Sequence, residues 1–317
     1  MKIVILGYSG FIGQSILENL IKNTSYDLVC VGRSIKKKPF QGARIKYFEW
    51  DFTSFNRLNF LFLKKVDIIV NCVGKTSNNF NNLEKTNLIF LKKLLKYLSS
   101  NKFKLRLIHL SSVSVYGGAE IYFNQTKIIK ENTKTKVHNF YSQSKLKGDK
   151  LIKSINKKNS NKNLSYTILR ISNVFEKKKK SNLYSFILFC LKFGFWIKSS
   201  NEVMYNFVNV KDVSQVIKLI ISNLKVSKNK TYIVSDDCRQ YDLYKIYNKF
   251  YNKKFLIISI PINLIKFLIN FFPMPKKLLN FFLLISTKVS YSNEKITKEL
   301  KFNPKFSLIK KIKDLNE

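Results

Sequence analysis

The sequence has few acidic residues and few arginines. Its 317 residues include 58 Lys and Arg against 19 Asp and Glu, which gives a formal net charge of +39. Only six of these cations are arginines, although Arg makes the bidentate contacts to guanine and phosphate that nucleic-acid recognition uses. The lysines are spread along the chain beside abundant Asn, Ile and Phe, as AT-rich codon usage produces. We therefore expect no specific nucleic-acid surface, although a positive field would still attract anionic nucleotides.

Cysteine and histidine are also scarce. The four cysteines stand far apart without a C-x-x-C pair, which predicts reduced core thiols rather than disulfides or a metal site. The two histidines, His109 and His138, form no ligand set with each other or with the cysteines. Because His109 lies inside an apolar strand-like run, we interpret it as a core or strand-end residue rather than a catalyst. No metal is expected.

Long apolar runs are missing as well. The most apolar stretches, 183–197 and 255–286, are interrupted, the first by Lys192 and the second by Lys266 and by prolines. Neither contains the roughly 18 uninterrupted apolar residues that a membrane-spanning helix needs. Met1 is followed by Lys2 and a short apolar strand that is too brief for a signal core, which predicts a cytoplasmic protein.

Predicted strands and helices alternate through the first 170 residues. Apolar strands are expected at Lys2–Leu6, 27–31, 45–50, 66–70, 105–110 and 165–169, and helices at 11–21, 88–98 and 141–154. Strands separated by helix-length segments imply right-handed crossovers. The pattern therefore predicts an α/β fold with a doubly wound parallel sheet covered on both faces.

The pattern loosens after Arg170. We predict a dinucleotide-binding domain over residues 1–175 and a smaller C-terminal substrate-binding lobe mainly over 176–317, with strands from about 206–235 returning to the sheet. The Phe- and Leu-rich segment 255–286 is interpreted as core helices of that lobe. Its apolar faces and flanking lysines leave a role at a membrane surface open.

Glycines join the first strand to the first helix. Gly7, Gly10 and Gly13 have the spacing G-x-x-G-x-x-G. Glycine permits the tight turn, close approach of the backbone to a pyrophosphate, and close contact between helix and strand. The helix N-terminus, at Phe11 and Ile12, then presents backbone N–H groups and a positive dipole end to the phosphates. This arrangement predicts a Rossmann-type nucleotide site.

The end of the second strand favours NADP over NAD. An acidic residue about 20 positions beyond the glycines would bind the adenosine ribose of NAD, but Arg33 stands 20 residues after Gly13 and lysines occupy 36–38. A guanidinium suits a 2′-phosphate. In a Lys-rich chain these cations also have a purely compositional explanation. Asp51, after the third strand, is a candidate either for the adenine amino group or for capping a turn.

Tyr141 and Lys145 form a candidate catalytic pair. They lie four residues apart at the start of a predicted helix, so they share one face. Tyrosine alone is a poor acid or base at neutral pH, and a neighbouring ammonium favours the phenolate. About 30 residues earlier, the run from Ser111 to Gly117 follows a strand, at the edge where parallel sheets bind ligands. There, a hydroxyl could hydrogen-bond the reacting carbonyl or alcohol.

With these motifs the chain resembles the extended short-chain dehydrogenases/reductases, the NAD-dependent epimerases and dehydratases that act mainly on nucleotide sugars. The resemblance covers most of the chain. It includes the loop from Asn71 to Gly74, the helix residue Asn87, the segment L-R-I-S-N-V that ends at Val174, F-V-N-V-K-D-V at 207–213, and L-K-F-N-P at 300–304.

The resemblance implies roles for individual residues. Ser112 would be the catalytic hydroxyl, Tyr141 the general acid and base, and Lys145 its partner and a ligand of the nicotinamide ribose. Asn71 and Gly74 would belong to the cofactor site, and Ser114 and Asn173 would join Ser112 in contacting a nucleotide-sugar substrate. A homodimer is also implied.

The chain departs from the family pattern at several positions. Dehydratases of the family carry Asp-Glu after the catalytic hydroxyl, whereas this chain has Val113 and Ser114, which disfavours elimination chemistry and decarboxylation. Glu176 and Lys301 stand where glycine is common. An epimerase and a 4-ketoreductase both fit, with Arg33 favouring the NADPH-dependent reductase. A non-catalytic cofactor-binding module is the alternative from another class.

Overall fold

The fold is described from a computed structural model. The residues that it describes are 1–35, 39–52, 60–63, 65–76, 80–100, 104–118, 121–158, 164–176, 182–200, 202–251, 255–273 and 275–307. The lysines at 36–38, expected beside a 2′-phosphate, lie outside these residues.

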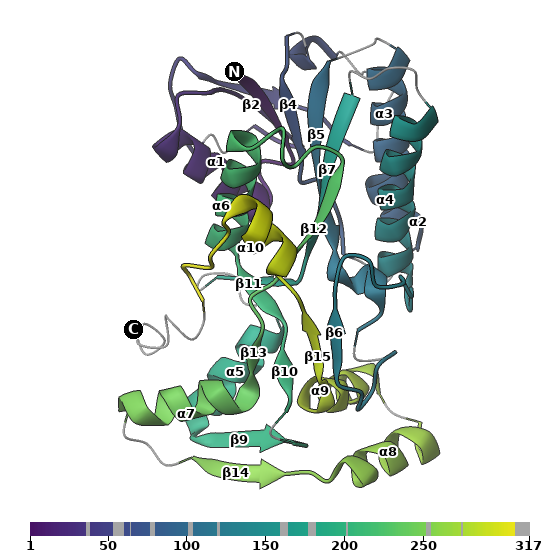
Figure 1. Ribbon diagram of the computed structural model, residues 1–317, viewed down its shortest axis with the longest axis vertical. Coiled ribbons are helices and arrows are strands. Elements are labelled where there is room, and N and C mark those ends of the chain that lie inside the picture. Colours follow the sequence, from purple (N-terminus) through teal and green to yellow (C-terminus); the bar gives the residue numbers. More distant parts are fainter. Residues whose placement is uncertain are drawn as a thin grey trace.

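A seven-stranded parallel sheet forms the upper half of the molecule (Figure 1). Its order is β12-β7-β5-β4-β1-β2-β3, with β1 at Lys2–Leu6, β2 at Asp27–Gly32, β3 at Ile45–Glu49, β4 at Ile68–Asn71, β5 at Leu105–Ser112, β7 at Leu164–Ile171 and β12 at Lys230–Val234. This is the strand order of dinucleotide-binding sheets. The strands β1 to β3 follow one another toward one edge of the sheet, and from β4 onward the strands are added on the other side of β1. The predicted α/β Rossmann-type fold is confirmed.

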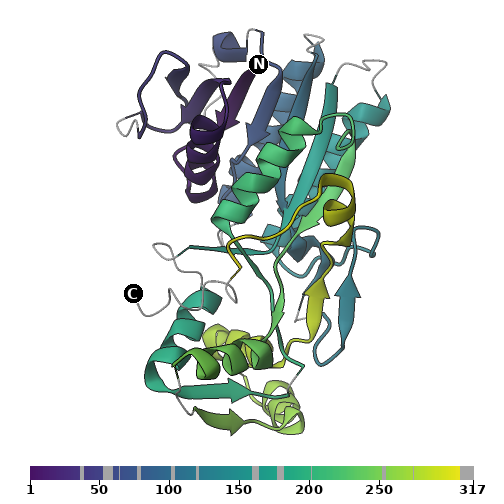
Figure 2. The same cartoon turned by 60° about the vertical axis from the view of Figure 1, so that its left-hand side comes forward.

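Helices cover both faces of the sheet (Figures 1 and 2). One face carries α1 (Phe11–Asn23), α6 (Val210–Ser222) and α10 (Glu294–Leu300), and the other carries α2 (Phe80–Leu83), the π-helical segment η2 (Glu84–Ile89), α3 (Phe90–Ser100) and α4 (Phe140–Lys158). Alternate residues of β1 serve the two cores: Ile3 packs with the first group and Val4 with the second. Strands buried on both sides explain the continuous apolar runs in the sequence.

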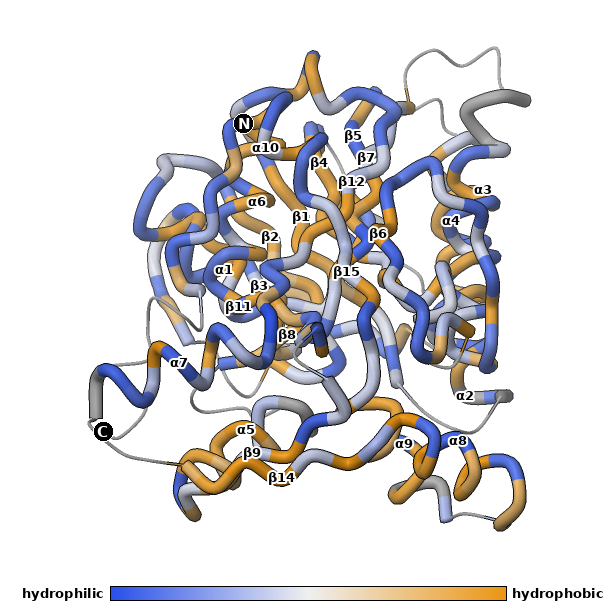
Figure 3. Tube along the Cα trace, turned by 60° about the horizontal axis from the view of Figure 1, so that its bottom comes forward, coloured by the Kyte–Doolittle hydropathy of each residue, from blue (hydrophilic) through white to orange (hydrophobic). Residues whose placement is uncertain are grey.

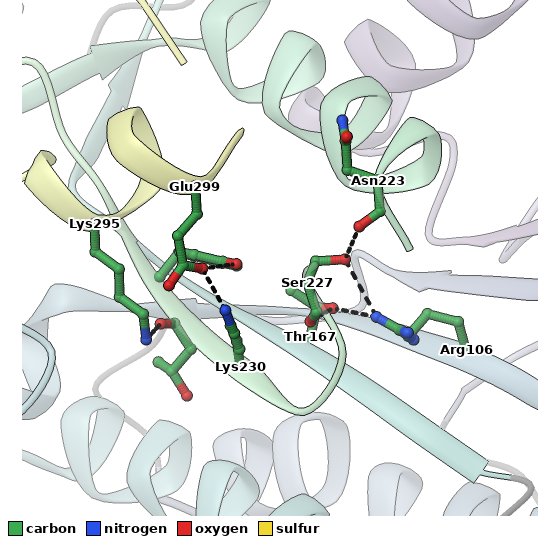
Figure 4. A network of polar contacts seen from close by, with 9 residues as sticks. Arg106, Thr167, Asn223, Ser227, Lys230, Lys295 and Glu299 are labelled. Atoms are coloured by element: carbon green, nitrogen blue, oxygen red, sulfur yellow. Dashed lines mark hydrogen bonds and ion pairs between the residues drawn. The ribbon is translucent and has the colours of Figure 1, made fainter. Parts of the chain in front are cut away.

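The amino-terminal end of the sheet is held by a buried arginine (Figure 4). Arg106, on β5, donates to Ser165 Oγ at 2.8 Å, to Thr167 Oγ1 at 3.0 Å and to Leu224 O at 2.6 Å. Burial lowers the pKa of this guanidinium. Since its partners are neutral acceptors far from the carboxyl edge, the network joins β5, β7 and the α6–β12 turn and is structural.

Short elements lie beyond the carboxyl ends of the strands (Figures 1 and 2). Four two-stranded pairs occur there: β8 (Asn173–Phe175) with β11 (Phe207–Asn209), β9 (Phe195–Lys198) with β14 (Leu256–Ser259), β10 (Met204–Tyr205) with β13 (Cys238–Arg239), and β6 (Lys127–Ile129) with β15 (Val289–Tyr291). They pack with α5 (Asn182–Phe193), α7 (Gln240–Tyr251), α8 (Ile262–Phe271) and α9 (Lys276–Ser286). Two 3-10 turns, η1 (Phe60–Leu63) and η3 (Val113–Tyr116), complete the described elements.

The strands expected over 206–235 divide between two sheets. β12 joins the large sheet beside β7, whereas β11 pairs with β8. The reason is that β8 begins at Asn173, just beyond the end of β7, so its partner also lies outside the large sheet. The domain boundary near residue 175 stays a prediction.

The segment 255–286 contains the two expected helices and one strand that was not expected. Ile265, Phe282 and Ile285 form a small buried core between α8 and α9. β14 pairs in parallel with β9. Among the described residues, no helix is both long and apolar enough to cross a bilayer.

Candidate active site

The glycine turn after β1 has no room for side chains. Gly7 has φ of +80°, a conformation that side chains disfavour. A Cβ on Gly13 would lie 2.3 Å from the Gly7 carbonyl oxygen and 2.8 Å from Tyr8 Cα. Gly10 is the N-cap of α1 and donates its N–H to Gly7 O at 3.0 Å. The start of α1, with Phe11 and Ile12, is thereby brought close to the end of β1, as a phosphate site at a helix N-terminus requires.

The loop after β4 is fixed by two buried amides. The side-chain oxygen of Asn71 accepts from the Val73 N–H at 3.0 Å. The side-chain nitrogen of Asn71 therefore points the other way and lies 3.1 Å from His109 Nδ1. Asn87, in η2, accepts from the Lys75 N–H at 2.9 Å and donates to Ser144 Oγ at 3.1 Å. Both side chains therefore hold the backbone of this loop against β5 and α4.

His109 is neutral in this environment. It lies in β5, buried, as expected of a core residue. Burial, and then the positive charge of Lys145, lower the pKa of His109 to about 3. Its Nδ1 accepts from the Asn71 amide, which is possible only for the unprotonated nitrogen.

Tyr141 and Lys145 meet at the start of α4. The Lys145 ammonium is buried, donates to Leu110 O at 3.0 Å and stands 5.9 Å from the centre of the Tyr141 ring. A Cβ on Gly74 would lie 3.0 Å from Lys145 Nζ, so a side chain there would crowd the ammonium. Ser112 ends β5, and its hydroxyl accepts from the Ser114 N–H at 3.2 Å.

A cavity of about 1000 Å³ brings many of the predicted residues together at the carboxyl edge of the sheet. Its lining includes Ser112, Tyr141, Lys145, Gly74, Ile12, Ser114 and Asn173. The predicted residues outside the lining are Gly7, Gly10, Phe11, Gly13, Arg33, Asp51 and Asn71. Of these, Arg33 and Asp51 are exposed, just beyond β2 and β3. They lie farther along the same sheet edge, on the other side of the glycine turn.

Three serines of the cavity lining, Ser111, Ser114 and Ser172, have buried side-chain oxygens. The side-chain oxygens of Ser114 and Ser172 are buried and have no hydrogen-bond partner among the described residues. A third lining residue, Cys72, is chemically quiet because burial raises the pKa of its thiol to about 12. Within the described residues, no group of three His, Cys, Asp or Glu side chains could hold a metal ion.

The family model described as NAD dependent epimerase/dehydratase family matches residues 3–235. The chain belongs to this family. A search of the curated proteins by sequence finds no match.

Solved structures of epimerases share the fold of this family member across nearly its whole length. UDP-glucuronic acid 4-epimerase from Bacillus cereus, in complex with NAD, is 16% identical with a TM-score of 0.72, over 98% of this chain and 94% of that one. UDP-glucose 4-epimerase from Thermotoga maritima, with UDP-glucose, is 18% identical with a TM-score of 0.71, over 99% and 96%.

A third similar structure carries the other nicotinamide cofactor. The protein RMD from Pseudomonas aeruginosa, complexed with NADPH, is 15% identical with a TM-score of 0.68, over 99% of this chain and 97% of that one. At these identities the comparisons establish a shared fold.

In this epimerase-family fold, part of the cavity lining was not predicted from the sequence. Lys75 and Thr76 directly follow Gly74, and His138 stands three residues before Tyr141, so extending those motifs could have found them. The distant wall comes from α5, β10, α9 and β15, with Phe186, Met204, Asn206, Asn280, Phe281, Leu283, Leu284, Thr287 and Tyr291. No spacing in the sequence marks these residues, because only tertiary packing brings them to the cavity.

A buried ion pair fixes α4 relative to the sheet. Arg170, on β7, donates to Asp149 Oδ2 at 3.0 Å and to the Tyr116 hydroxyl at 2.6 Å. Asp149 lies one helical turn beyond Lys145 on α4. The pair therefore connects the helix that carries Tyr141 to the strand beside β5.

Proposed function

We propose that this chain catalyses reversible hydride transfer at a hydroxyl-bearing carbon of a nucleotide-linked sugar, with C4 as the expected position, as an NAD(P)-dependent epimerase or 4-ketoreductase. The observation that carries the proposal is the meeting of Ser112, Tyr141 and Lys145 in one large cavity beside the glycine turn. The UDP-sugars named with the similar solved structures support a nucleotide sugar as the substrate class.

The residues around the turn fit a dinucleotide. A Cβ on Gly13 would clash with Gly7 O and Tyr8 Cα, so glycine there lets α1 begin close to the end of β1, where its N-terminus can bind the pyrophosphate. Arg33, exposed after β2, lies on the side where the adenosine half would bind and is the candidate partner of a 2′-phosphate. Gly74 and Lys145 would hold the nicotinamide half, which when bound accepts and returns a hydride.

The three polar side chains have separate roles in this proposal. The Tyr141 side chain, as phenolate, takes the proton of the reacting sugar hydroxyl while the hydride passes to the nicotinamide, and as phenol it returns the proton to the carbonyl oxygen in the reverse direction. The Ser112 hydroxyl hydrogen-bonds the same sugar oxygen. The Lys145 ammonium supplies the positive charge beside the phenol. Val113 is buried, and Ser114 provides a hydroxyl where elimination would need a carboxylate.

Replacing the phenol tests the assignment. With UDP-glucose and UDP-glucuronic acid as probes, Tyr141→Phe is expected to lower turnover at least about 100-fold, because general acid–base catalysis contributes that much or more. Tyr26→Phe is the matched control, since Tyr26 precedes β2 at the opposite edge of the sheet. Undiminished turnover of Tyr141→Phe would refute the catalytic role of Tyr141, whereas cofactor binding by the native protein without turnover would favour a non-catalytic cofactor-binding module.

The retained cofactor distinguishes the two reactions. Mass spectrometry of small molecules released from natively purified protein is expected to find tightly held NAD for an epimerase and NADP for a reductase. A nucleotide sugar released in the same experiment identifies the substrate when neither probe is turned over.

A further inference from the structure

Exposed apolar side chains gather at one end of the molecule. Ten of the fifteen exposed large apolar residues in the described chain lie in two segments, 182–200 and 255–286. Figure 3 shows these segments, α5, β9, β14, α9 and α8, as a mostly apolar band along the lower end. We define the apolar face by its most exposed members, Phe189, Phe193, Leu256, Phe267, Phe271 and Phe272.

The members of the apolar face cluster rather than standing singly. The ring centres of Phe267 and Phe271 are 5.0 Å apart, and those of Phe189 and Phe193 are 4.7 Å apart. Phe271 is 70% exposed and Leu256 is 68% exposed. Exposed apolar side chains that gather at one end of a protein mark a contact with a partner or a membrane, whereas apolar residues scattered singly need no explanation.

The charge around the apolar face selects the partner. The segments 182–200 and 255–286 together contain five lysines and no acidic residue. Lys192 and Lys266 are exposed beside Phe193 and Phe267, and a second copy of the chain would bring the same cations against them, which disfavours self-association through this face. A bilayer with anionic headgroups offers both an apolar interior for the phenylalanines and negative charge for the lysines.

We propose that the apolar face binds the surface of a lipid bilayer that carries anionic headgroups. The helices lie in the interface, since among the described residues no helix could span a membrane. Phe281, Leu283 and Leu284 of α9 line the cavity, while α8 packs against α9 through Ile265 and Phe282. Binding through α8 therefore places the α9 wall of the cavity next to the membrane surface.

Flotation of the full chain with vesicles tests this proposal. We expect the protein to float with vesicles of phosphatidylcholine mixed with phosphatidylglycerol, to float much less with phosphatidylcholine alone, and to be released by high salt. The double variant Phe267→Ser, Phe271→Ser is expected to bind at least about tenfold more weakly, because two exposed aromatic rings lose their apolar contact. Val226→Ser, in the α6–β12 turn, is the control and should bind like the native protein.

Folding and self-association are measured alongside. Circular dichroism and cofactor binding are expected to be unchanged in the double variant, since Phe267 and Phe271 project outward from α8. Absence of flotation, or equal flotation of the double variant, overturns the proposal. Light scattering could instead find a dimer of the native protein and a monomer of the double variant. If the native protein then also fails to float, the apolar face is assigned to contact with a second copy of the chain. These readouts need no substrate, so they leave the catalytic proposal untouched.

Discussion

Removing the charge of Arg170 is expected to destabilise the protein strongly. Arg170→Met keeps a side chain of similar length on β7 but leaves the Asp149 carboxylate on α4 without its cation. The two charges are 3.0 Å apart, and their side chains are only 5% and 1% exposed. Burial raises the pKa of Asp149, and the neighbouring guanidinium is the largest opposing influence.

The magnitude follows from this burial. Breaking a buried ion pair by removing one partner costs about 3–5 kcal/mol, a large part of the roughly 5–15 kcal/mol by which proteins are stable. For a chain of this size, about 2 °C of melting temperature corresponds to 1 kcal/mol, so a decrease of about 6–10 °C is expected. The Tyr116 hydroxyl retains its bond to Glu131 O and adds little to the loss.

Urea unfolding of three variants measures this effect. Asp149→Leu should lose about as much stability as Arg170→Met, because it leaves the buried Arg170 guanidinium without its anion. The double variant should recover most of the loss, since two apolar side chains leave no buried charge. Single variants that each lose less than about 1 kcal/mol, or a double variant that loses their sum, would refute this account of how α4 is held.

Three further outcomes are expected. In the folded chain His109 has a pKa of about 3 against 6.5 when unfolded, so the unfolded chain binds the extra proton as pH falls. Between pH 7.5 and about 5, the free energy of unfolding of the native protein should thus fall by about 2 kcal/mol more than that of His109→Gln. An equal fall in the two proteins, measured by urea unfolding at each pH, would contradict this. Gly13→Ala should weaken dinucleotide binding about tenfold or more in calorimetry, because the added Cβ would lie 2.3 Å from Gly7 O. Unchanged affinity would show that the turn does not form part of the cofactor site. Native protein should bind NADPH more tightly than NADH, and Arg33→Ala should abolish the difference; equal affinities in the native protein would remove the NADP assignment.

The sheet could be predicted because its strands are buried on both faces. Periodicity and apolar runs located six of the seven strands of the large sheet to within a few residues, and the seventh, β12, lies within the stretch 206–235 that was expected to return to the sheet. Short pairs such as β6 with β15, and β9 with β14, escaped prediction because two to four residues carry no period. Their pairing depends on which segments the fold brings side by side. β14 in particular lies inside an apolar stretch that resembles the helices after it.

The site was predictable on its sheet side and not on its distant side. Gly13, Ser112 and Tyr141 stand at strand ends and helix starts, which the sequence pattern locates. Asn71 stays a predicted residue of the cofactor site, and its side chain orders the loop after β4 through Val73 and His109. The wall from α9 comes from ordinary apolar helix residues, so nothing distinguishes them until the chain has folded.

The unpaired hydroxyls of the cavity bear on which ligand it takes. Ser114 and Ser172 lie in the lining, with buried oxygens that no described residue satisfies. Leaving a buried hydroxyl unpaired costs about 1–3 kcal/mol, and a ligand recovers that free energy only if it brings its own donors and acceptors. An apolar ligand would leave both oxygens unpaired, whereas a ligand that carries hydroxyls brings donors and acceptors of the required kind. The buried hydroxyls of Ser114 and Ser172 therefore favour a polar ligand, in agreement with the sugar proposed as substrate.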